Sequence, residues 1–159
     1  MKIYGHRIYE EQFSTKGWGK YPSEEVIRFF IKAKARIKTT NPKALDIGCG
    51  IGSCTWFMAK EGASVTAIDG APSGLKKVKK LADEFGIDNN IITVHGDITK
   101  PLTFIKSTFN IMVDSYSLYS NEENYPYMVK IFDSNELGYK KLKVKVFEID
   151  YEKFNNNNE

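Results

Sequence analysis

The stretch ALDIGCGIGSCTWF, residues 44–57, places three glycines at alternate positions directly after a short apolar run that contains an aspartate. The apolar run predicts a buried strand, and residues 53–61 predict a helix. Glycines between a strand and a helix permit a tight turn and let a ligand approach the main chain closely. We therefore expect a ligand at this turn, with the carboxylate of Asp46 beside it.

The elements around this turn predict the fold class. Strand, helix, strand, helix and strand follow one another, which requires crossover connections and a parallel sheet covered on both faces. The sequence therefore predicts an α/β fold with a doubly wound, mostly parallel sheet. The expected helices occupy residues 22–37, 53–61 and 73–86, and the expected strands occupy residues 44–47, 64–69, 90–97 and 109–115.

Length and composition narrow the class of protein. A chain of 159 residues, 42% hydrophobic, is long enough for one domain with a core. The net charge of +3 gives no strong argument for a nucleic-acid or membrane partner. Cys49 and Cys54 form neither a CxxC nor a metal-type cluster, so we expect no bound metal and a reducing compartment. The polar N-terminus and the absence of an apolar run of about 18 residues predict a cytoplasmic protein.

Four predicted strand ends carry an acid, namely Asp46, Asp69, Asp97 and Asp114. In open α/β sheets the ligand lies outside the carboxyl ends of the strands, beside the first strand. A single aspartate there is an ordinary turn or cap residue, whereas four beside a glycine turn indicate a binding site. We expect Asp69 to lie at an exposed strand end.

The spacing around the turn separates two kinds of nucleoside ligand. In the dinucleotide fingerprint GxGxxG a pyrophosphate lies on a helix N-terminus, and Gly48, Gly50 and Ser53 imitate that pattern loosely. The carboxylate of Asp46 would repel a pyrophosphate in this pocket and attract an ammonium group. The pattern favours a nucleoside without phosphates and with a cationic end, a description that S-adenosylmethionine fits. An NAD-dependent oxidoreductase remains the alternative.

Four segments, LDIGCGIG, VTAIDGAP, VHGDIT and FNIMVDSYSLY, resemble the first four motifs of the class I S-adenosylmethionine-dependent methyltransferases, in order and spacing. The resemblance covers about residues 20–120 and implies a Rossmann-like sheet, methyltransferase activity and S-adenosylhomocysteine as product. By position, it implies that Gly48, Gly50 and Gly52 lie under the cofactor. It also implies that Asp46 holds the methionine amine, directly or through water.

The same resemblance implies the remaining cofactor contacts. Asp69 would accept hydrogen bonds from both ribose hydroxyls, as a two-oxygen acceptor can. Asp97 would accept from the adenine amino group, while Ile98 meets the adenine ring and Gly70 leaves room for its other face. Asp114 would stand at the boundary between cofactor and substrate.

Residues 1–22 are expected to form an aromatic lid segment before a binding domain at residues 23–154. The ring of Trp18 is a candidate for cofactor contact because aromatic faces attract cations such as a sulfonium. Packing of Trp18 and Tyr21 onto the domain is the alternative. His6 is a candidate base on the substrate side.

The C-terminal half of the domain departs from the family's pattern. Residues 142–154 predict one long strand, and residues 155–159, NNNNE, predict a disordered tail. The stretch between Asn121 and Tyr139 is too short for the elements that the family places there. We expect this half to be shortened or incomplete, because a parallel sheet left open at its fourth strand would expose an apolar edge.

The reaction implied by the resemblance is direct, in-line transfer of the methyl group from the sulfonium. It requires alignment of the reacting atoms and a general base only for a protonated acceptor, so no catalytic residue is assigned. The sequence VDSY in the fourth strand lacks the Asn/Asp-Pro-Pro-aromatic motif of amino-group nucleic-acid methyltransferases. With the small net charge, this predicts a small-molecule or metabolite acceptor. A cofactor-binding but inactive partner module is a further alternative, and the oligomeric state is not indicated.

Overall fold

The computed structural model describes residues 6–16, 19–98, 109–115 and 117 of the chain. The helices and strands expected between residues 22 and 115 are present close to their expected positions. The expected strand at residues 142–154, the tail and the shortened C-terminal half lie outside the described residues. In chain order the elements are α1 (His6–Thr15), α2 (Glu24–Arg36), β1 (Lys43–Ile47), α3 (Ser53–Lys60), β2 (Ser64–Asp69), α4 (Pro72–Phe85), the 3-10 turn η1 (Asp88–Asn90), β3 (Ile91–His95) and β4 (Ile111–Asp114).

The described strands form one parallel sheet in the order β3-β2-β1-β4. The chain begins with β1, steps outward through β2 to β3, and then returns to the other side of β1 with β4. The direction of winding therefore reverses at β1, where ligands bind in sheets of this kind. Because the strands are parallel and Ile47 is in register with Ile68 and Asp114, their carboxyl ends meet at one edge. The predicted doubly wound α/β fold is confirmed.

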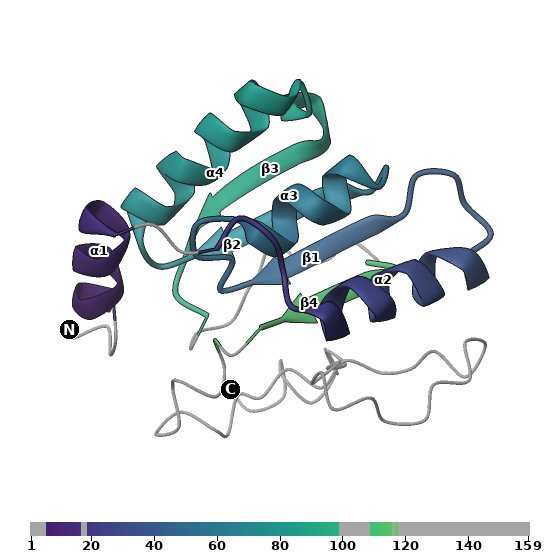
Figure 1. Cartoon of the computed structure of the whole chain (residues 1–159), viewed down its shortest axis with the longest axis horizontal. Helices are drawn as coiled ribbons and strands as arrows, with labels where there is room; N and C mark the ends of the chain where they lie inside the picture. The colour runs from purple at the N-terminus through teal and green to yellow at the C-terminus, as the bar shows by residue number, and fades with distance from the viewer. Residues whose placement is uncertain (1–5, 17–18, 99–108, 116, 118–159) are drawn as a thin grey trace, which may run out of the picture.

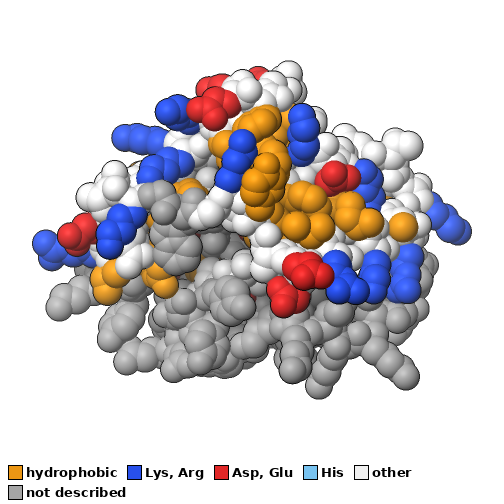
Figure 2. Space-filling model, viewed as in Figure 1, with side chains coloured by type: hydrophobic (Ala, Val, Ile, Leu, Met, Phe, Trp, Pro, Cys, Tyr) orange, Lys and Arg blue, Asp and Glu red, His pale blue; other side chains and the backbone are white. Residues whose placement is uncertain are grey.

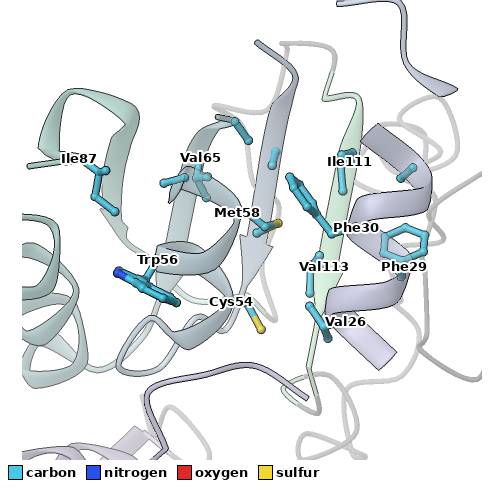
Figure 3. Packing of buried hydrophobic residues seen from close by; sticks show 14 of the residues in the cluster. Val26, Phe29, Phe30, Cys54, Trp56, Met58, Val65, Ile87, Ile111 and Val113 are labelled. Atoms are coloured by element: carbon cyan, nitrogen blue, oxygen red, sulfur yellow. The ribbon is translucent and has the colours of Figure 1, made fainter. Parts of the chain in front are cut away.

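Helices α2, α3 and α4 lie side by side against one face of this sheet (Figure 1). Their apolar side chains pack with every second residue of the strands, and Figure 3 shows Phe30 of α2, Met58 of α3 and Val113 of β4 in this core. The strand residues that point the other way are buried as well, including Leu45 and Met112. Burial of both faces agrees with the sheet predicted from the crossover pattern.

Helix α1, which the sequence analysis did not predict, packs against the beginning of α4 (Figure 1). The carboxylate of Glu10 accepts hydrogen bonds from the Ser73 backbone N–H at 3.0 Å and from the Ser73 hydroxyl at 2.9 Å. A negative charge at the first turn of a helix satisfies free N–H groups and complements the helix dipole. The N-terminal segment thus contains a docked helix, while its role as a lid and the domain boundary after residue 22 stay predictions.

The face shown in Figure 2 carries a band of hydrophobic side chains with lysines beside it. In an aromatic cluster, Tyr21 and Phe85 each meet Trp56 edge to face, with ring centroids 5.2 Å apart. The Lys20 ammonium lies 4.0 Å from the Phe85 ring centroid, within cation–π range. Tyr21 therefore packs onto the domain, whereas Trp18 lies outside the described residues. No helix within the described ranges is long and apolar enough to cross a membrane.

Candidate functional site

The three glycines between β1 and α3 each have a positive φ. Gly48, Gly50 and Gly52 have φ values of 63°, 55° and 92°, which residues with a Cβ rarely adopt. The Gly52 N–H donates to the Cys49 carbonyl at 2.9 Å, and the Gly52 carbonyl accepts from the Trp56 N–H at 2.8 Å. The predicted glycine turn is thus present, and its backbone leads directly into the first turn of α3.

Neighbouring elements pack tightly against this turn. A Cβ at Gly52 would lie 2.8 Å from Cγ2 of Val78 on α4, and a Cβ at Gly50 would lie 3.2 Å from the ring of Phe13 on α1. A Cβ at Gly48 would overlap Ser117, just after β4. The turn is therefore the place where α1, α4 and the end of β4 converge.

Asp46 is buried beneath the turn, with 1% of its surface exposed. It points to the helix-covered face of the sheet, where the Thr55 hydroxyl donates to its Oδ2 at 2.5 Å. The pKa of the Asp46 carboxyl is raised to about 7, mainly by burial and also by the charges of Asp69 and Asp114, against the opposing hydrogen bonds from Thr55. A cation brought to this carboxylate would therefore be strongly favoured over an anion.

Asp69 lies at the end of β2 but is not exposed, which corrects the expectation from the sequence. Only 8% of its surface is exposed. Its Oδ2 accepts from the Gly50 N–H at 2.7 Å, and its Oδ1 accepts from the Ala71 N–H at 2.7 Å. It is buried because the glycine turn and the start of α4 both fold over it. Each carboxylate oxygen is able to accept more than one hydrogen bond.

Asp114 closes the site on the other side of β1, with 3% of its surface exposed. Its Oδ1 accepts from the Ser117 N–H at 2.9 Å and also contacts the Ser117 hydroxyl. That hydroxyl donates to the Ile47 carbonyl at 2.8 Å. Ser117 therefore ties the end of β4 to the end of β1 at the point where the winding of the sheet reverses.

The residues after β2 and β3 complete the same edge. The Gly96 N–H donates to the Asp69 carbonyl at 3.0 Å, and the His95 Nε2 lies 3.2 Å from the Gly70 carbonyl oxygen. Asp97 and Ile98 follow directly and are half-buried. The structure thus brings nine of the ten expected cofactor residues to one edge of the sheet. The tenth, Trp18, lies outside the described residues.

Neither cysteine near the turn is suited to act as a nucleophile. Both are buried, and burial raises the pKa of the Cys49 and Cys54 thiols. A buried thiol that stays protonated is unreactive.

Sequence reasoning missed Thr55, Glu10 and Ser117. Thr55 could have been noticed as the polar residue inside the apolar run CTWFMA of α3. The contact of Glu10 with Ser73 and that of Ser117 with the Ile47 carbonyl join residues far apart in the chain, which no local pattern specifies.

Comparison with known proteins identifies a family. A family model described as a methyltransferase domain matches residues 44–134. A probable cobalt-precorrin-6B C(15)-methyltransferase from Saccharolobus solfataricus is 33% identical over 91 residues, which cover 55% of this chain and 45% of that protein. A 23S rRNA (uracil(1939)-C(5))-methyltransferase from Shewanella sediminis is 33% identical over 78 residues, 49% of this chain and 17% of that protein. The chain thus spans less than half the length of these curated relatives.

A solved structure shows the same fold. A methyltransferase from Geobacter sulfurreducens, in complex with S-adenosyl-L-homocysteine, superposes with a TM-score of 0.57 at 19% identity. The match covers 72% of this chain and 45% of that one.

Proposed function

The chain belongs to the class I, Rossmann-like family of S-adenosylmethionine-dependent methyltransferases, and on that premise we propose that it binds S-adenosylmethionine and transfers its methyl group to a small molecule. The observation that carries the proposal is the gathering of three buried carboxylates, Asp46, Asp69 and Asp114, around one glycine turn. Such a site favours a cationic ligand and disfavours the pyrophosphate of a dinucleotide.

Each part of the cofactor has a partner of suitable chemistry. Asp69, whose carboxylate already accepts from the N–H groups of Gly50 and Ala71 beside the turn, accepts hydrogen bonds from the ribose hydroxyls. Asp97 and Ile98 recognise adenine from the end of β3. Asp46 attracts the ammonium end of the methionine moiety, directly or through an ordered water.

The reaction requires alignment more than acid–base chemistry. Transfer of a methyl group from a sulfonium neutralises a positive charge, so holding the acceptor in line with the methyl group supplies most of what is needed. A base is required only if the acceptor atom carries a proton. The acceptor would approach from the side of Asp114 and Ser115, at the end of β4.

Two observations bear on the class of the acceptor. The net charge of +3 is small for a protein that binds a nucleic-acid backbone. The name of the Saccharolobus relative places its reaction on a cobalt-precorrin, whereas the Shewanella relative is named for ribosomal RNA. The contrast between these relatives makes acceptor class the point to test.

Calorimetry with S-adenosylhomocysteine and with NAD tests the cofactor. We expect S-adenosylhomocysteine alone to bind, and Asp69→Asn to weaken it by about 1.5–3 kcal/mol, the range for hydrogen bonds with a charged partner. Asp83→Asn, which changes an exposed acid on α4, is the matched control and should bind normally. Tighter binding of NAD than of S-adenosylhomocysteine would point to an oxidoreductase.

A transfer assay tests the acceptor. Labelled S-adenosylmethionine is incubated with the protein and either a metabolite extract or total RNA, and we expect label in the metabolite fraction. Label in RNA alone would refute the small-molecule acceptor, and cofactor binding without transfer to either would indicate an inactive module.

A further inference from the structure

We propose that Thr55 is a positioning residue, which orients the Asp46 carboxylate and keeps it ionised for the cationic end of the cofactor. This inference rests on the proposed function and concerns one residue of the same site. Thr55 does not belong to the glycine turn, and none of the four motif segments contains it. Its hydroxyl nevertheless contacts Asp46 from the neighbouring helix α3.

The geometry leaves the Thr55 hydroxyl little freedom. Thr55 has 0% of its surface exposed, and its hydroxyl donates to Asp46 Oδ2 at 2.5 Å. A β-branched side chain in a helix has few χ1 choices, and α3 is held by core residues on either side, Cys54 and Met58 among them. Thr55 therefore fixes the direction in which Asp46 points.

The charges around Asp46 show why this hydrogen bond matters. Asp69 from β2 and Asp114 from β4 both oppose ionisation of Asp46, and burial opposes it most. The nearby thiols of Cys49 and Cys54 have raised pKa values and stay neutral. Among the described residues, the groups that lower the pKa of Asp46 are the hydroxyl and the backbone N–H of Thr55.

A substitution at Thr55 can remove the hydroxyl but leaves the backbone N–H. The N–H lies in the first turn of α3, where it has no partner within the helix, and it remains in any variant. The hydroxyl is the part that a substitution can remove. Without it, Asp46 stays protonated to a higher pH, and a protonated carboxyl attracts a cation weakly.

Cofactor binding should therefore be linked to the proton on Asp46. With a pKa of about 7 in the empty protein, a fraction of the molecules at neutral pH must lose that proton when a cation binds. Adenosine, which has no charged end, should bind without this proton loss.

The test compares Thr55→Val, which keeps the side-chain shape, with Thr55→Ser, which keeps the hydroxyl. S-adenosylmethionine and adenosine are titrated by calorimetry at pH 7 and pH 9. If loss of the hydroxyl raises the pKa of Asp46 by about one unit, Thr55→Val binds the cofactor about fivefold more weakly than wild type at pH 7, and nearly as well at pH 9. Thr55→Ser should follow wild type, and adenosine should bind all three proteins alike.

The cofactor's own α-amino group titrates near pH 8, so its affinity changes between pH 7 and pH 9 even without a change at Asp46. Asp46→Asn measures that change, which is then subtracted from the result for each protein. Equal weakening of both ligands at both pH values would show that Thr55 only packs the helix, and would overturn the inference. Should Thr55→Val fail to fold, Thr55→Ala takes its place, and heats measured in two buffers of different ionisation enthalpy count the protons that each protein releases. Equal proton release by wild type and the variant at pH 7 would also overturn the inference. A wild type that binds no S-adenosylmethionine at either pH would instead refute the proposed function.

Discussion

Gly52→Ala should destabilise the protein more than Gly62→Ala, although the two glycines have nearly the same backbone conformation. Gly52 precedes α3 with a φ of 92°, and Gly62 follows the same helix with a φ of 91°. A Cβ at Gly52 would lie 2.8 Å from Cγ2 of Val78, whereas a Cβ at Gly62 would meet only the end of the Lys34 side chain at 3.8 Å. Gly62→Ala therefore serves as the control for backbone strain.

The structure gives the expected size of the difference. Left-handed backbone costs an L-residue about 1–2 kcal/mol, and both variants bear this cost. Val78 is buried and β-branched, so it cannot rotate away from a new methyl group, and forced repacking of a core costs about 1–3 kcal/mol more. We expect a loss of about 1–2 kcal/mol for Gly62→Ala and about 2–5 kcal/mol for Gly52→Ala.

Urea unfolding followed by far-ultraviolet circular dichroism measures both losses, provided the slope of the transition is unchanged. Val78→Ala, alone and combined with Gly52→Ala, completes a double-mutant cycle, which should give a coupling energy of about 1–3 kcal/mol. Equal losses for the two alanine variants, or no coupling with Val78, would refute the close approach of α4 to the glycine turn.

Two further perturbations address Asp46 and α1. The pKa of Asp46 is raised from 3.8 to about 7. The stabilisation from its protonated form is therefore fully present below pH 4 and is lost as the pH rises through 7. Wild type should lose about 4 kcal/mol of unfolding free energy from this source between pH 4 and pH 8. Urea unfolding across that range should show this loss to be missing in Asp46→Asn, and parallel curves would contradict it. Phe13→Ala removes the ring that packs beside Gly50 and should speed amide hydrogen exchange within His6–Thr15; unchanged exchange there would contradict its anchoring role.

Much of the fold followed from local patterns. The apolar spacing of α2 and α4, the short apolar strands and the glycine that ends α4 specify those elements directly, since Gly86 adopts left-handed backbone at the end of the helix. The position of the site followed as well, because parallel strands bring their carboxyl ends to one edge. The sequence therefore predicts where Asp46 and Asp69 lie along their strands.

The parts that could not be predicted depend on packing between distant residues. The burial of Asp69 arises because the glycine turn and α4 fold over it, and no pattern within β2 reveals this. Helix α1 has no acidic residue in its first turn and no basic residue in its last turn, so its sequence carries weak signals. Its docking depends on Phe13 and on the contact of Glu10 with Ser73. The pairing of Thr55 with Asp46 depends on how α3 is rotated against β1.

The contact between Glu10 and Ser73 has a consequence for the order in which the chain folds. The two residues are 63 positions apart in sequence, and a helix of 10 residues is marginal by itself in water. During synthesis α1 leaves the ribosome before α4, and the Ser73 groups that bind Glu10 exist only once the start of α4 has been made. Helix α1 is therefore expected to reach its native position after β1, α3 and β2 have assembled.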